Sequence, residues 1–343
     1  MRNFLFEKKK DERYENINIL GLNLKFKRKI FKKTENINYF INKTVFSSWK
    51  NAGCSDELMT LLKFLETTNL SLNKELLLVY TACLLEKDNN DEAKRVLSKY
   101  LMLNGDIDQI SRFLPVSKLA CDNGIHSNLV DYGASIFEKF ENAHKEKIFI
   151  NFIKNKKVAI VGNGPQEIGK KSGCEIDSHD VVIRFNKFKI AGHEIDYGRK
   201  TDIWCRNFQS VNENWICPVT TKLVIYKGDY WHQPFQTKDY FEKNIIKDNV
   251  LIDCIGFKQN ALVKKYFPNQ NDPTLGFSIA LWILDYFKTF RNIDFYGFSF
   301  LEDTYKGCLH YFDDQKNIQN QIQALHHHKE ESMILKQLTE KYK

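Results

Sequence analysis

Long apolar runs are absent from this chain of 343 residues. No stretch reaches the roughly 20 apolar residues that a membrane-spanning helix needs, and the opening "MRNFLFEKKKDERYENINIL" lacks the apolar core of a signal peptide. The eight cysteines are scattered without a CxxC pair, which argues against a zinc ribbon and against a disulfide scaffold. We therefore expect reduced thiols and a cytoplasmic protein.

The common phosphate-binding motifs are incomplete. A dinucleotide site has the pattern GxGxxG, with an acidic residue about 20 positions later. Here the loop "GNGPQEIG" spaces its third glycine too widely, and Arg184 and Asn186 stand at the end of the next apolar run. A Walker A loop fails because its lysine is followed by a second lysine. The glycine turn alone indicates either an anion-binding corner or an ordinary tight turn.

What the sequence does contain is typical of a folded protein, with 43% hydrophobic and 13% aromatic residues. Its formal net charge of +8 suits an anionic substrate, an acidic membrane surface or nucleic acid, and equally a solvated surface rich in Lys and Asn. Net charge therefore does not choose a class of partner.

Three zones follow one another along the chain. Residues 1–43 are basic, and "INILGLNLKFKRKIFKK" alternates apolar and polar residues like a small hairpin. The lysines and arginine of residues 25–33 indicate either peripheral docking on anionic lipid, at the inner face of the cell membrane, or an ordinary solvated arm. Residues 44–150 have a helical period, and 75–87 with 91–103 look like a helical hairpin of the tetratricopeptide kind.

The third zone, residues 151–343, alternates short β-rich runs with helical stretches, which predicts an α/β domain with a mainly parallel sheet. We expect strands at 158–162, 181–185, 223–226, 250–255 and 293–297, and a largely helical segment at 274–290.

Four motifs in this third zone resemble those of one family. "VAIVGNGPQEIGKKSGCEIDSHDVVIRFNKFKIAGHEIDYGRKTDIW" resembles the large sialylmotif of glycosyltransferase family 29, the eukaryotic-type sialyltransferases. "DPTLGFSIALWILDYFKTFRNIDFYGFS" resembles the small motif, "HYFDD" motif III, and "HHHKEESMIL" the very small motif H-x4-E. Together they cover roughly residues 155 to 340. The resemblance implies a Rossmann-like sheet flanked by helices, a GT-A-like variant, here preceded by a small α-helical domain.

The resemblance also implies an activity. It is the inverting transfer of a nonulosonic acid, sialic acid first, from a CMP donor to a hydroxyl of a surface glycan. The composition, rich in Asn, Lys and Ile, is typical of an AT-rich genome and indicates lipooligosaccharide or capsule as that glycan. His326 would be the general base with Glu331 as its orienting partner, and His310 would donate to the leaving phosphate. The residues expected to bind the donor are Asn163, Gly164, Asn186, Thr274, Leu275, Gly276 and Phe277. For the side chain of Phe277 we expect core packing.

Such a donor carries one phosphate and no chelated diphosphate, so the reaction requires no metal. No convincing DxD motif is present, because "FDDQ" and "KDNND" are explained better as solvated turns. We therefore expect no metal and no cofactor. The expected partners are a CMP-sugar and a glycan acceptor, and not nucleic acid.

The sequence departs from the family at two places. Val158 stands where animal members have a cysteine that bridges to the small motif, and the small motif here has none, which fits a reducing compartment. His326, His327 and His328 are contiguous, so the base could be any of the three. The main alternative keeps the fold and changes the sugar to Kdo, legionaminic or pseudaminic acid. More distant alternatives are an NAD-binding Rossmann oxidoreductase and a binding module that has lost catalysis.

Overall fold

The computed structural model of the chain describes ten stretches. They are residues 6–10, 14–19, 22–27, 34–67, 74–207, 217–232, 250–266, 273–298, 310–312 and 328–343. The chain forms two compact units, the first made of Met1–Glu138 with Asp229–Thr237 and the second of Lys139–Gly228 with Lys238–Lys343. The domain boundaries predicted after residues 43 and 150 stay a prediction.

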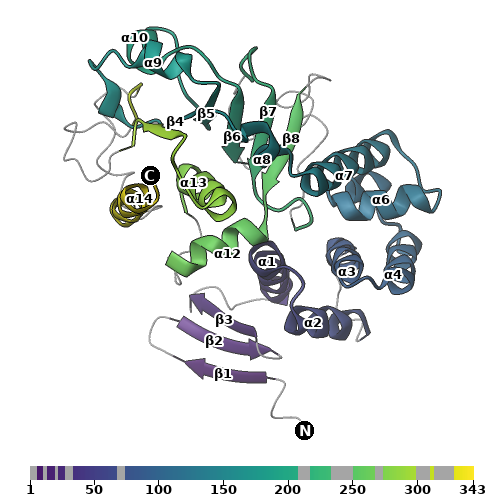
Figure 1. Cartoon of the computed structure of the whole chain (residues 1–343). Helices are drawn as coiled ribbons and strands as arrows, with labels where there is room; N and C mark the ends of the chain where they lie inside the picture. Colours follow the sequence, from purple (N-terminus) through teal and green to yellow (C-terminus); the bar gives the residue numbers. More distant parts are fainter. Residues whose placement is uncertain are drawn as a thin grey trace. The chain divides into compact units, whose positions relative to one another are not determined.

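The first unit begins with a small antiparallel sheet (Figure 1). Its strands are β1 (Phe6–Lys10), β2 (Tyr14–Ile19) and β3 (Leu22–Lys27). The antiparallel register of β2 and β3 places Ile17 opposite Leu24. This pairing confirms the hairpin that the alternation predicted.

The other regular elements described in the first unit are helices. They are α1 (Thr34–Ala52), α2 (Asp56–Thr67), α3 (Lys74–Glu86), α4 (Asn90–Met102), α5 (Ile107–Ile110), α6 (Leu114–Asp122) and the first part of α7 (Asn128–Glu146). Helix α3 is apolar on all sides, as a central buried helix must be. Helices α3 and α4 pack together across a short turn, which confirms the predicted helical pair. None of the described helices is long and apolar enough to cross a membrane.

The second unit is built on a six-stranded parallel sheet in the order β8-β7-β6-β5-β4-β9 (Figure 1). Its strands are β4 (Val158–Val161), β5 (Val181–Phe185), β6 (Ile203–Asn207), β7 (Leu223–Lys227), β8 (Leu251–Ile255) and β9 (Ile293–Tyr296). Five of them lie where the sequence predicted strands. Strand β6 was not predicted, because its short apolar run continues into Arg206 and Asn207, which are typical of a loop.

Helices cover both faces of this sheet, which confirms the predicted architecture. They are α8 (Ile148–Ile153), α9 (Gly173–Ser178), α10 (Glu194–Tyr197), α12 (Phe257–Tyr266), α13 (Leu275–Phe287) and α14 (His328–Tyr342). Val158 and Ile160 of β4 pack in a core with residues of α8, α13 and α14. Ala159 and Val161 pack on the opposite face with residues of α9 and α10. Because both faces are buried, the strands read as continuous apolar runs.

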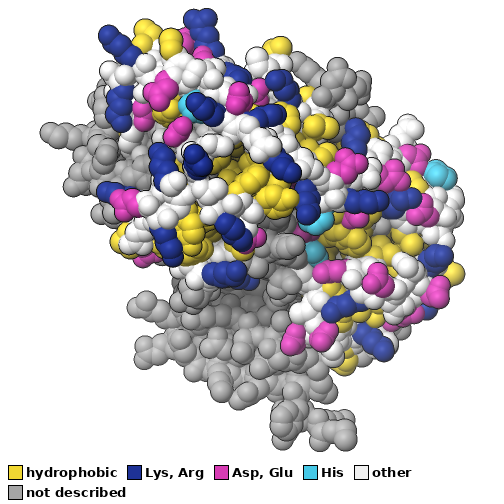
Figure 2. All heavy atoms as spheres, in the orientation of Figure 1, with side chains coloured by type: hydrophobic (Ala, Val, Ile, Leu, Met, Phe, Trp, Pro, Cys, Tyr) yellow, Lys and Arg dark blue, Asp and Glu magenta, His cyan; other side chains and the backbone are white. Residues whose placement is uncertain are grey.

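The basic excess of the chain is not concentrated on the surface that Figure 2 shows. Among the described residues on that face, Lys and Arg side chains are scattered between Asp and Glu and form no single stripe. In a protein that binds the phosphate backbone of a nucleic acid, the basic residues usually cluster in such a stripe.

Candidate functional site

The direction in which strands are added to the sheet changes at β4. From β4 to β8 each new strand joins on one side, and β9 then joins on the other side of β4. In open parallel sheets, ligands bind outside the carboxyl ends of the strands at such a switch point. We therefore place the candidate site where the loops after β4, β5 and β9 leave the sheet.

The loops after β4 and β9 run in direct backbone contact. The N–H of Gly162 donates to the carbonyl oxygen of Tyr296 at 2.8 Å, and the N–H of Gly164 donates to that of Gly297 at 3.0 Å. A Cβ on Gly297 would lie 2.5 Å from the carbonyl oxygen of Gly162, and a Cβ on Gly162 would lie 2.6 Å from that of Gly297. Gly297 also has a φ of +67°, which glycine adopts without strain. Both positions therefore require glycine.

Two stacked tyrosines hold these loops in place. The rings of Tyr197 and Tyr311 lie 3.8 Å apart at 16°. The Tyr197 hydroxyl accepts from the N–H of Glu167 at 3.3 Å and donates to the carbonyl oxygen of Gly164 at 2.6 Å. The Tyr311 hydroxyl accepts from the N–H of Lys189 at 3.1 Å and donates to its carbonyl oxygen at 2.6 Å. Burial raises the pKa of both phenols, so both remain donors at working pH.

Asn163 and Asn186 link the loop after β4 to the loop after β5. The side-chain NH2 of Asn163 donates to the carbonyl oxygens of Phe185 at 3.1 Å and Lys187 at 2.9 Å. Asn186 has a φ of 47°, in the left-handed region that asparagine tolerates. Its Oδ1 accepts from the N–H of Asn207, the last residue of β6, at 3.1 Å. Both predicted asparagines therefore lie at the carboxyl edge, where they also fix the shape of their own loops.

The start of α13 lies at the same edge and is held by Glu331 of α14. The carboxylate of Glu331, only 4% exposed, accepts from the N–H of Thr274 at 2.9 and 3.2 Å and from its hydroxyl at 2.5 Å. Thr274 caps the helix, since its Oγ1 accepts from the N–H of Phe277 at 3.3 Å. A carboxylate at a helix N-terminus also interacts favourably with the positive end of the helix dipole. The small and very small motifs therefore meet through one threonine.

The residues of the Thr274–Phe277 turn differ in their surroundings. Leu275 and Phe277 are buried in the core beneath the sheet, as we expected for the Phe277 side chain. A Cβ on Gly276 would lie 3.0 Å from the ring of Phe298, the residue after Gly297. This close approach brings the first turn of α13 beside the loop after β9.

Of the two predicted catalytic histidines, one is described. His310 is half-buried, and its ring stacks on that of Phe312 with centroids 5.2 Å apart. The N–H of the adjacent Tyr311 donates to the carbonyl oxygen of Asn163 at 2.9 Å, which brings His310 to the glycine loop. His326 and His327 lie outside the described residues, and α14 begins at His328.

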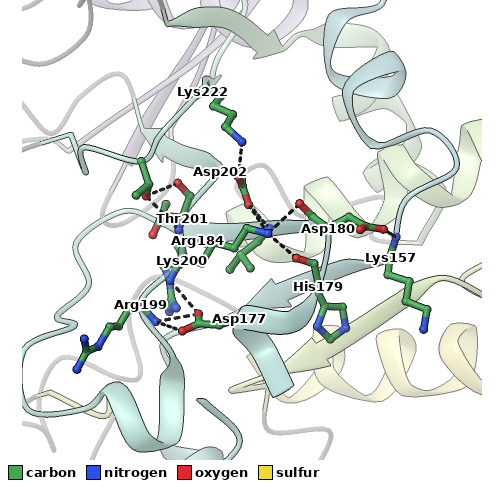
Figure 3. Close-up of polar contacts among 12 residues, drawn as sticks. Lys157, Asp177, His179, Asp180, Arg184, Arg199, Lys200, Thr201, Asp202 and Lys222 are labelled. Atoms are coloured by element: carbon green, nitrogen blue, oxygen red, sulfur yellow. Dashed lines mark hydrogen bonds and ion pairs between the residues drawn. The ribbon is translucent and has the colours of Figure 1, made fainter. Parts of the chain in front are cut away.

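The opposite edge of the sheet carries a network of charges (Figure 3). Asp202, only 2% exposed, comes directly before β6 and accepts from the N–H of Val182 at 2.9 Å and from Lys222 Nζ at 3.1 Å. Lys200 Nζ donates to the carbonyl oxygen of Asp180 at 3.0 Å and lies 3.5 Å from the carboxylate of Asp202. These residues join the amino ends of β5, β6 and β7, the edge away from the candidate site.

Further polar contacts tie "DYGRKTD" to the rest of the large motif. Asp177 Oδ1 accepts from the N–H groups of Arg199 and Lys200, both at 2.9 Å. The buried guanidinium of Arg184 donates to the carbonyl oxygens of Lys200 at 3.0 Å and Tyr197 at 2.5 Å. The charged residues of this motif therefore hold the fold together, a role that the sequence analysis did not assign to them.

Comparison with known proteins finds similarity to one family. Residues 126–241 match the family model described as Glycosyltransferase family 29 (sialyltransferase). The type 2 lactosamine alpha-2,3-sialyltransferase of Rattus norvegicus is 27% identical over 256 residues, which cover 65% of this chain and 76% of that protein. The Homo sapiens protein of the same name is 25% identical over 230 residues, which cover 60% of this chain and 66% of its own length.

A solved mammalian sialyltransferase in complex with Gal-beta-1-3GalNAc-ortho-nitrophenol matches 53% of this chain and 66% of its own, with a TM-score of 0.38 and 22% identity. The region that matches the family model includes the loops after β4 and β5 and the amino-edge charges. The motifs of α13, His310 and α14 lie beyond it.

Proposed function

Because this chain belongs to glycosyltransferase family 29, we propose that it transfers a nonulosonic acid, sialic acid first, from a CMP donor to a glycan hydroxyl. One observation carries the proposal. Segments far apart in the sequence, which resemble the four motifs of the family, meet at the edge of the sheet where parallel sheets bind nucleotides.

In the proposed reaction, the acceptor oxygen attacks the anomeric carbon of the donor sugar and inverts its configuration. The bond from that carbon to the phosphate oxygen breaks, and its electron pair leaves with CMP. His326 takes the proton of the acceptor hydroxyl, because an imidazole has a pKa near working pH. His310 donates to the phosphate as negative charge grows on it.

The donor phosphate, in this proposal, binds at the start of α13. The carboxylate of Glu331 accepts a hydrogen bond from the N–H of Thr274, and the Thr274 hydroxyl accepts one from the N–H of Phe277. The N–H groups of Leu275 and Gly276 are therefore the first-turn donors that can bind an anion. Asn163, Gly164 and Asn186 line the neighbouring loops and contact the rest of CMP. Glu331 acts by positioning the helix, and its orienting role toward His326 stays a prediction.

The relatives suggest which acceptor to test first. Both are named as type 2 lactosamine alpha-2,3-sialyltransferases, so we propose a lactosamine-like terminus on lipooligosaccharide or capsule. We place the reaction in the cytoplasm, at the inner face of an anionic membrane that the basic residues 25–33 would contact. The seven described cysteines are all free, which suits a reducing compartment. Nucleic acid is not a proposed partner, because the family that the chain resembles implies a CMP-sugar donor and a glycan acceptor.

The test measures CMP release by the full chain. CMP-sialic acid, CMP-Kdo, CMP-legionaminic acid and CMP-pseudaminic acid are each incubated with N-acetyllactosamine, with and without EDTA. We expect acceptor-dependent release from CMP-sialic acid at the same rate in EDTA. Release from another CMP-sugar instead would replace the proposed sugar, and activity that disappears in EDTA and returns with Mg²⁺ or Mn²⁺ would contradict metal independence. Thermal stabilisation by NAD but not by CMP would overturn the proposal.

A further inference from the structure

Three potential metal ligands meet at the α6–α7 connection of the first unit. Cys121 lies in the last turn of α6, His126 in the following loop and Asp131 in the first turn of α7. Their ligand atoms all lie within 4.8 Å of one another. Asp131 Oδ1 is 2.7 Å from His126 Nδ1 and 3.1 Å from Cys121 Sγ. In the part of the chain that the structure describes, no other three Cys, His, Asp or Glu side chains converge this closely.

The loop that carries His126 is fixed at both ends. The N–H of Ile125 donates to the carbonyl oxygen of Ala120 at 3.0 Å, which closes the end of α6. At the start of α7, Ser127 Oγ accepts from the N–H of Val130 at 3.2 Å, as a capping serine does. The three ligands are therefore held near one another by backbone contacts that do not depend on an ion.

We propose that Cys121, His126 and Asp131 bind a Zn²⁺ ion, with water in the fourth position. A thiolate, an imidazole and a carboxylate are all ligands of zinc, with bonds of about 2.0–2.3 Å. A tetrahedral ion of that size separates its ligand atoms by about 3.3–3.7 Å. The distances from Asp131 Oδ1 to His126 Nδ1 (2.7 Å) and to Cys121 Sγ (3.1 Å) therefore need to increase only slightly to admit an ion.

The surroundings admit an ion from solvent. The side chains of His126 and Asp131 are 58% and 52% exposed. The carbonyl end of α6 points its partial negative charge toward the same turn, which favours a cation. Cys121 binds as a thiolate, so its proton leaves to solvent when the ion enters. The ion joins α6 to α7 across their connecting loop and takes no part in the proposed transfer.

The experiment is a Co²⁺ titration of the full chain after removal of metals with EDTA. We expect a thiolate-to-cobalt charge-transfer band that Zn²⁺ abolishes by displacing cobalt. Cys121→Ser should lose the band, and Asp131→Asn should weaken the binding. The matched control is Cys174→Ser, which removes an exposed cysteine outside the cluster and should keep the band.

A second readout is the melting temperature. Zn²⁺ should raise the Tm of the wild-type chain and of Cys174→Ser by at least about 2 °C, and leave that of Cys121→Ser unchanged. Absence of the band in the wild type would overturn the proposal, and so would a band or a Zn²⁺-dependent rise in Tm that survives in Cys121→Ser. Because neither readout involves CMP, the proposal fails or stands separately from the proposed activity.

Discussion

The two edges of the parallel sheet are built from different chemistry, although the large motif contributes to both. At the amino edge, Lys200, Lys222 and Asp202 pair with one another and with backbone groups (Figure 3). At the carboxyl edge, glycines, asparagines and tyrosine hydroxyls shape loops whose backbones nearly touch. At the amino edge the charged side chains are thus paired within the fold, whereas at the carboxyl edge polar loops are available to a ligand.

The charged residues of a motif can therefore hold the fold together without contacting a ligand. Asp202 and Lys200 belong to a motif of the family, yet their partners lie at the amino ends of strands, away from the switch point. Substitutions there should change stability. Substitutions at the carboxyl edge should change binding or turnover.

The largest effect is expected for His326. If it is the general base, His326→Ala should lower kcat by about 10²–10⁴-fold and leave CMP affinity almost unchanged. Initial rates and a CMP titration measure the two quantities. His327→Ala is the matched control, because in a helical segment its side chain projects about 100° away. An inactive His328→Ala beside an active His326→Ala would show that the motif has been placed in the wrong register.

His310 should behave differently from His326. His310→Ala removes the donor to the leaving phosphate, so kcat should also fall. A donor with a better leaving group should restore the rate of His310→Ala more than that of His326→Ala. Equal restoration of the two variants would remove the distinction between their roles.

The next largest effect is expected for Gly297. Gly297→Ala places a Cβ 2.5 Å from the carbonyl oxygen of Gly162 and should separate the two loops, which lowers kcat/KM by about 10²-fold. Gly192→Ala is the control, since its φ of +85° also lies in the left-handed region, with nothing within 4 Å of the new Cβ. Similar losses of activity in both variants would show that loop contact is not what matters.

A smaller effect is expected for Glu331. Glu331→Ala leaves the N–H and hydroxyl of Thr274 without this acceptor, which should raise the donor KM about tenfold and cost about 1–3 kcal/mol of stability. Glu331→Gln keeps one acceptor oxygen and should recover part of both losses. A fall in kcat with an unchanged KM would instead indicate that Glu331 acts on the chemistry.

At the amino edge we expect no effect on turnover. Asp202→Asn weakens the contacts to Lys200 and Lys222 and should lower the free energy of unfolding by about 1–3 kcal/mol. Urea denaturation measures that loss, and initial rates on the folded protein should match the wild type. A kcat reduced more than tenfold in folded Asp202→Asn would break the division between the edges.

The smallest effect at neutral pH concerns a histidine in the first unit. Burial alone would lower the pKa of His232, but its pairs with Asp229 at 2.9 Å and Glu86 at 2.7 Å outweigh burial and raise the pKa to about 9. Because the folded state binds this proton more tightly, protonated His232 contributes its full stabilisation below about pH 6.5. The contribution is lost as the pH rises through 9. Stability should therefore fall by up to about 3 kcal/mol by pH 10.

His232→Gln is the control for this pH dependence. Its free energy of unfolding should lack the decline between pH 7 and 10, whereas the wild type should show it in urea titrations at each pH. Parallel curves for the two proteins would mean that His232 does not carry the charge.

The sequence predicted most of the sheet because buried parallel strands are continuous apolar runs. It missed β6, whose end carries Arg206 and Asn207. The glycines and asparagines of the site came from the family resemblance. Tyr197 and Tyr311 were missed, because single aromatic residues in loops give no periodic signal and their stacking joins positions far apart in the chain.

The partner of Glu331 could not be predicted either. It contacts Thr274 across 57 positions of sequence, and only the packing of α14 beside α13 brings them together. The predicted local partner, His326, lies outside the described residues. Long-range polar contacts of this kind depend on tertiary structure, which spacing along the chain does not report.

Amide hydrogen exchange of the full chain with and without CMP tests the central claim most directly. If the nucleotide binds at the carboxyl edge, protection should increase in peptides that contain residues 162–164, 274–277 and 297–298 and remain unchanged at 177–182 and 199–202. NAD at the same concentration should protect neither group. Protection by CMP that is confined to the amino edge, or that is absent from the glycine loops, would contradict the account.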